Sequence, residues 1–157
     1  MGIENQNGLG SLGRRLAYVI LRVSLGINMF MHFAGRFHTG LQNWVAATEK
    51  PFVDSVLPMW IAHSWLTILS PIEGVVGILL IFGLWTPWTL VAEGVVMTVL
   101  VFGISLRAHF YVSSPATAGL TATVSQQMIY LLTIFALLAM VQENHFSLDT
   151  LIDKRRK

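Results

Sequence analysis

Four apolar stretches set the main constraint on this chain, because a helix needs roughly 20 mostly apolar residues to cross the hydrocarbon of a membrane. They run from about Leu16–Gly35, Leu66–Trp85 and Trp88–Leu106 to about Ala122–Val141. Only 11% of the residues are charged, whereas a soluble domain carries about 25%. The sequence therefore predicts an all-α fold, an antiparallel bundle of four transmembrane helices.

The connections between these stretches differ in length. Thr86, Pro87 and Trp88 form a very short turn, so the second and third helices are expected to be antiparallel neighbours. The segment Phe37–Ser64 is too polar to span and contains several tryptophans, so it is either an ordinary extracytoplasmic loop or an interfacial helix. We expect residues 1–13 to be a disordered cytoplasmic leader, 14–149 the membrane domain and 150–157 a basic cytoplasmic tail.

Basic residues gather near both ends of the chain. With four spans both ends lie on one side, and lysine and arginine mark the cytoplasmic side of a membrane protein. These residues are Arg14, Arg15, Lys154, Arg155, Arg156 and Lys157. The sequence thus predicts a multi-pass protein of a bacterial or archaeal inner membrane with both termini in the cytoplasm. The net charge of +2 gives no reason to expect nucleic acid as a partner.

Two glutamates lie inside the apolar stretches, where an ionisable residue costs at least about 2.5–3.5 kcal/mol on insertion scales. Counting along the helices places Glu93 in the inner half of the membrane at the depth of Arg22. Opposite charges at matching depth predict a structural ion pair between Arg22 and Glu93. Glu73 falls in the outer half instead.

A larger set of polar residues falls in the outer half, and all four stretches contribute to it. Its members are Asn28, His32, Arg36, Glu73, Arg107, His109, Gln126, Gln127 and Tyr130. Since charged groups avoid lipid, these side chains are expected to line a polar pocket that opens toward the outer leaflet.

This outer pocket suits a quinone, whose headgroup needs hydrogen-bond donors for its carbonyls and a group that exchanges protons. Glu73 and His32 are the candidate proton carriers. The candidates for binding the headgroup are Arg36, Asn28, Gln126, Gln127, Tyr130, Arg107 and His109. A b-type haem held by His32 and His109 is a second option, and a metal ion held by these histidines and Glu73 a third. Alternatively, Arg36 and Arg107 snorkel to the headgroups and the glutamines only join helices.

Several short motifs give the chain a family resemblance. They are Leu21–Gly26 followed by Gly35–Phe37, then Glu73–Thr86 with its glutamate and glycines, and finally Phe146–Asp149 before a basic tail. In this order, over about residues 14–155, they resemble the DoxX family, which is related to the small subunit of thiosulfate:quinone oxidoreductase. Arg36 stands where lysine is common in that family.

The resemblance implies a four-helix membrane protein, often a subunit of a quinone-linked redox complex. Our first hypothesis is such a subunit, which would be a non-autonomous part of an enzyme. Electrons would come from a larger protein partner that carries the redox centre, because this chain has no flavin, iron–sulfur or nicotinamide motif. The alternative is a non-catalytic anchor or assembly subunit, in which the outer polar cluster joins the helices. Membrane lipids are expected partners in both cases, and an oligomer remains an option.

Overall fold

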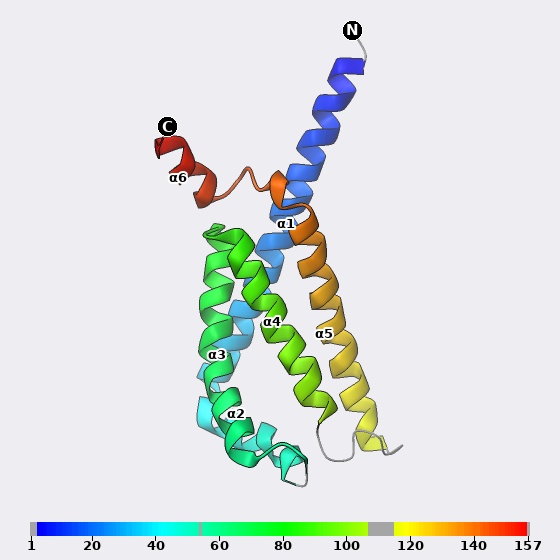
Figure 1. The fold of residues 1–157 in the computed structure, drawn as a ribbon, viewed down its shortest axis with the longest axis vertical. Helices are drawn as coiled ribbons and strands as arrows, with labels where there is room; N and C mark the ends of the chain where they lie inside the picture. Colours follow the sequence, from blue (N-terminus) through cyan, green and yellow to red (C-terminus); the bar gives the residue numbers. More distant parts are fainter. Residues whose placement is uncertain (1–2, 54, 107–114, 157) are drawn as a thin grey trace.

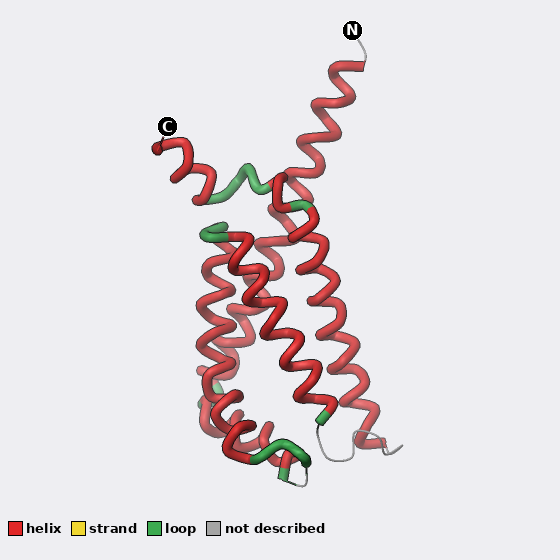
Figure 2. The backbone as a smooth tube through the Cα atoms, in the orientation of Figure 1, coloured by secondary structure: helices red, strands yellow, loops and turns green. Residues whose placement is uncertain are grey.

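The computed structural model describes the backbone of residues 3–53, 55–106 and 115–156. These residues form helices joined by short loops and contain no strand (Figure 2), which confirms the predicted all-α class. The elements in chain order are α1 (Ile3–His38), α2 (Leu41–Glu49), η1 (Lys50–Phe52), α3 (Met59–Phe82), α4 (Thr86–Ser105), α5 (Pro115–Ala139), η2 (Val141–Glu143) and α6 (Leu148–Arg156).

Among the described residues, three helices are long and apolar enough to cross a membrane. They are Gly10–His38 within α1, Met59–Phe82 and Thr86–Ser105. The first contains the first predicted span, and the other two overlap most of the second and third. The fourth predicted span lies on α5, where the described apolar stretch is Gln126–Ala139. The chain is therefore a membrane protein by the length and composition of its helices.

The long helices alternate in direction (Figure 1). α1 and α4 run away from the end that carries both termini, which we call the terminal end, and α3 and α5 run back toward it. α2 lies at the opposite end, which we call the far end, and α6 lies at the terminal end. α1 packs along α3, α3 along α4, and α4 along α5.

The ends of the chain differ from the prediction. α1 begins at Ile3, so helix occupies most of the expected disordered leader. Adding residues to an existing helix is much easier than starting one, and the long apolar part of α1 supplies that start. The tail is the short helix α6. Between the first two spans the structure has the helix α2 followed by η1.

The connection between α3 and α4 is as short as predicted but lies three residues earlier. Gly83 ends α3 in the left-handed region, with φ of 66°, and the Leu84 amide donates to the Leu79 carbonyl over 2.9 Å. This is a helix ending that glycine favours. α4 already begins at Thr86 with a proline in its first turn, where the fixed φ of proline suits a helix.

α1 and α3 approach each other closely at two glycines. A Cβ atom on Gly77 would lie 2.7 Å from the Phe30 amide nitrogen and 2.8 Å from the Gly26 carbonyl oxygen. Small residues permit such contact between membrane helices. The contact fixes the register of the two helices that carry the central polar residues.

Gly77→Ala is therefore expected to lower the free energy of unfolding by about 1–3 kcal/mol, the usual cost of overpacking. The added methyl group meets backbone atoms, which cannot rotate away as a side chain can. The measurement is unfolding of the purified protein in detergent. Gly103→Ala is the matched control, since a Cβ atom there meets nothing within 4 Å; equal losses in both variants would contradict the close contact.

Candidate functional site

Arg36 and Glu73 form an ion pair between α1 and α3. Arg36 Nη1 bonds Glu73 Oε2, and Arg36 Nη2 lies 3.4 Å from Glu73 Oε1. The Glu73 side chain is 2% exposed and that of Arg36 is 15% exposed. Side chains on a helix tilt toward its N-terminus, which for Arg36 means into the bundle and away from the far end. The alternative in which Arg36 snorkels outward is therefore wrong.

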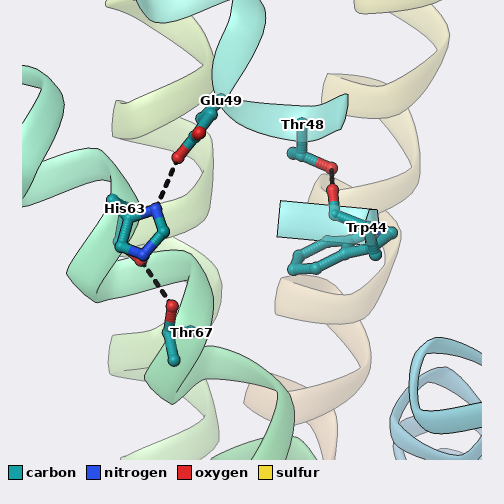
Figure 3. A network of polar contacts seen from close by, with 5 residues as sticks. All are labelled: Trp44, Thr48, Glu49, His63 and Thr67. Carbon is teal, nitrogen blue, oxygen red and sulfur yellow. Dashed lines mark hydrogen bonds and ion pairs between the residues drawn. The ribbon is translucent and has the colours of Figure 1, made fainter. Parts of the chain in front are cut away.

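Helix α2 covers this pair from the far end. The Arg36 guanidinium carbon lies 4.1 Å from the centre of the Trp44 ring, a cation–π distance. α2 is itself tied to α3, because Glu49 Oε2 and His63 Nδ1 are 2.7 Å apart (Figure 3). The structure thus gives Arg36 a carboxylate on one side and an aromatic ring on another, each from a different helix.

Glu93 of α4 belongs to the neighbourhood of Glu73. Glu73 lies nine residues before the end of α3 and Glu93 seven residues after the start of α4, so their depths differ by only about 3 Å at 1.5 Å per residue. α3 and α4 pack against each other, so the two carboxyl groups lie at nearly the same depth on neighbouring helices. Glu93 is 0% exposed, and neither of its oxygens has a hydrogen-bond partner among the described residues.

The predicted ion pair between Arg22 and Glu93 is wrong. Arg22 bonds Asn144 Oδ1, and its Nη2 donates to the Phe146 carbonyl over 2.9 Å. Arg22 sits against Gly83 at the end of α3, and its side chain tilts toward the terminal end as the direction of α1 requires. Neutral acceptors at that end therefore bind both Nη atoms of Arg22, while Glu93 lies deeper in the bundle.

We accordingly expect the stability losses of Arg22→Ala and Glu93→Ala to add in the double variant, within about 0.5 kcal/mol, as they do for residues that share no partner. The four proteins of this cycle are compared by unfolding in one detergent. A coupling energy above about 1 kcal/mol would instead support a direct ion pair between Arg22 and Glu93.

A second polar cluster surrounds the α3–α4 turn and was missed by the sequence analysis. Asp149 accepts hydrogen bonds from the amides of Trp85 and Thr86 at 2.8 and 2.9 Å and from the Thr86 hydroxyl at 3.1 Å. Asn144 donates to the same hydroxyl over 3.0 Å. A carboxylate at this position caps the first amides of α4. The signal in the sequence is a helix start whose own N-cap residue, Trp85, has no capping side chain.

The other predicted outer residues are not all brought together. His32 is half-buried and lies one turn before Arg36 on α1, close enough to interact with the charge of that guanidinium. Gln126 donates to the Tyr130 hydroxyl over 2.8 Å within α5, so among the described hydrogen bonds these two side chains join each other and not the Arg36–Glu73 pair. Arg107 and His109 lie outside the described residues. The haem and metal options of the sequence analysis both need His109, so the structure does not test them.

Several buried polar atoms inside the bundle have no hydrogen-bond partner among the described residues. They include Asn28 Nδ2 on α1, Ser70 Oγ on α3, both carboxyl oxygens of Glu93 on α4, and Gln127 Oε1 on α5. Buried polar groups are normally hydrogen-bonded. A polar ligand would satisfy donors and acceptors of these kinds.

The comparisons with known proteins agree with the membrane character of the chain. The DoxX family model matches residues 17–108, which is more than half of the sequence. This region contains most of α1 and all of α2, α3 and α4, and so Arg36, Glu73 and Glu93. No curated protein and no solved structure matches the chain.

Proposed function

The chain belongs to the DoxX family of membrane proteins, and from this premise we propose that it is an integral membrane subunit of a quinone-linked oxidoreductase. In this proposal the quinone headgroup binds beside Arg36 and Glu73, in the half of the bundle nearer the far end. The observation that carries the proposal is the buried Arg36–Glu73 pair with the unpaired carboxyl of Glu93 close by.

The cost of burying charge favours a functional role for the Arg36–Glu73 pair and Glu93. A buried ion pair is often no more stabilising than apolar residues of the same size, so its presence in an apolar span calls for another reason. Arg36 supplies donors for a quinone carbonyl. Glu73 or Glu93 relays a proton, which the carboxylate first takes up from water and then gives to an oxygen of the reduced quinone. His32 lies one turn away as a further proton carrier, and the unpaired Asn28 amide is a further donor.

An apolar pocket between α3 and α4 suits the quinone tail. It has a volume of about 170 Å³ and is lined by residues that include Ala62, Trp65, Leu66, Val99 and Leu100. Leu66 lies seven residues before Glu73, about two helical turns along α3. A headgroup at the ion pair and a tail along this pocket would therefore occupy the same side of α3.

The membrane arrangement is part of the proposal. We take α5 as the fourth span, which makes an antiparallel bundle of four transmembrane helices in a bacterial or archaeal inner membrane. The termini lie at one end, and the basic residues there favour the cytoplasmic side. The quinone site then faces the outer leaflet, with α2 at the membrane surface. Electrons reach the quinone from a larger protein partner that carries the redox centre.

Quinone binding is tested by tryptophan fluorescence of the purified chain in detergent. Trp44 stacks on Arg36 and Trp65 lines the apolar pocket, so a short-chain ubiquinone is expected to quench the emission in a saturable way. The isoprenoid alcohol with the same tail is the matched control, because it has no carbonyl groups for Arg36. Saturation by the quinone alone supports the proposal; equal responses, or none, reject it.

The alternative function is a non-catalytic anchor or assembly subunit. It is favoured by the fact that Arg36 and Glu73 already satisfy each other inside the chain. Under this alternative the pair joins α1 to α3, and the fluorescence titration shows no preference for the quinone.

A further inference from the structure

We propose that a pocket at the terminal end binds the headgroup of an anionic phospholipid. It lies between α1, the end of α3 and α6 and has a volume of about 460 Å³. Three basic residues line it, Arg22, His145 and Lys154, together with apolar residues that include Phe82 and Phe146. This site is at the other end of the molecule from Arg36 and Glu73, so it does not depend on the quinone proposal.

The charge of Arg22 is the first argument. The residue is 2% exposed, and its two guanidinium hydrogen bonds go to neutral oxygens, those of Asn144 and Phe146. Its Nε atom is buried and has no hydrogen-bond partner among the described residues. Both oxygens of the Asp149 carboxylate accept bonds from the start of α4, and no salt bridge of the described residues includes Arg22. Arg22 therefore has no carboxylate in direct contact and can attract an anion.

The other basic residues at this end argue for the same pocket. Arg14 and Arg15 both approach Glu143, at 3.0 and 3.8 Å, so this one carboxylate compensates part of their charge. In contrast, no salt bridge of the described residues includes Lys154. The free positive charge of the pocket thus comes from Arg22 and Lys154, and the His145 ring lies beside them.

The apolar walls favour a lipid over a soluble anion. Leu148, Leu151 and Ile152 fall on one face of α6 at helical spacing and are exposed. Phe82 and Phe146 in the pocket wall are 55% and 53% exposed. A short helix with exposed apolar residues and adjacent basic ones lies in the membrane interface. A phospholipid places its phosphate among the basic groups and its acyl chains along these apolar residues.

The test measures thermal unfolding of the full-length protein in neutral detergent with added phosphatidylglycerol, phosphatidylcholine or inorganic phosphate. We expect phosphatidylglycerol to raise the unfolding temperature in a saturable way and the other two to have little effect. A basic residue near an anionic lipid surface contributes about 1 kcal/mol, so Lys154→Gln is expected to weaken the phosphatidylglycerol affinity about fivefold.

Arg155→Gln is the matched control. It removes the same charge from the same helix, but Arg155 is not among the residues that line the pocket. The affinity of this variant for phosphatidylglycerol is expected to stay within about twofold of that of the unchanged protein. If both variants lose the same affinity for phosphatidylglycerol, the lipid is attracted by the overall surface charge and the proposed site is wrong. Equal stabilisation by inorganic phosphate, or by phosphatidylcholine, would overturn its assignment to an anionic lipid. Both variants replace exposed side chains, so the fold is retained.

Discussion

Arg36→Ala is expected to lower the free energy of unfolding by about 3–5 kcal/mol, because it leaves the buried carboxylate of Glu73 without its partner. The Glu73 side chain is 2% exposed, so water cannot replace the guanidinium. The variant also removes the group that stacks on Trp44. The measurement is denaturant or thermal unfolding of the purified protein in detergent.

A double variant separates this pair from a general loss of packing. Arg36→Ala with Glu73→Ala removes both charges and is expected to recover part of the loss, as coupled residues do. Lys50→Ala is the control for charge alone, since Lys50 is exposed and directly follows α2. Additive losses at positions 36 and 73 would mean that the two side chains contribute independently and would contradict the ion pair.

Glu73→Gln is expected to reduce quinone-dependent turnover about a hundredfold, the lower range for losing a proton-transferring group. The glutamine amide keeps an oxygen that accepts a hydrogen bond from Arg36, but it cannot take up and release the proton. The rate is measured in membranes that contain the chain with its native partners. It is normalised to the amount of assembled chain, so a loss of assembly is not counted as a loss of turnover.

Glu49→Gln is the matched control for this substitution. It also removes one carboxylate near the far end, but Glu49 bonds the half-exposed His63 outside the apolar core, so turnover is expected to be nearly unchanged. If Glu73→Gln turns over normally, Glu73 does not carry the proton. If the complex instead falls apart while the fluorescence titration is negative, the anchor function is favoured.

The helices that form the membrane part were predictable because the bilayer dictates their length. Apolar stretches of about 20 residues have few alternatives to a helix in lipid, and α1, α3 and α4 cover most of the predicted stretches. Their exact ends were not predictable from hydropathy alone. α4 starts at Thr86 although the predicted span started at Trp88, because a proline in the first turn continues into a helix.

The pairing of charges was predicted only in part. Glu73 and Arg36 were both assigned to the outer polar cluster, and the structure joins them directly. Arg22 was paired with Glu93 by counting depth from the helix ends. Depth ignores the direction of a long side chain, and Arg22 reaches toward the terminal end. Its partners Asn144 and Phe146 lie more than a hundred residues away in the sequence, where no local pattern reveals them.

The bonds from Asp149 to Trp85 and Thr86 have a consequence for biogenesis. The start of α4 is synthesised 63 residues before the carboxylate that caps it, so its first amides enter the membrane without this acceptor. The hairpin of α3 and α4 can form its hydrogen bonds to Asp149 only after translation has passed that residue. Removal of the last nine residues would therefore destabilise the connection between α3 and α4, which lies in the middle of the chain.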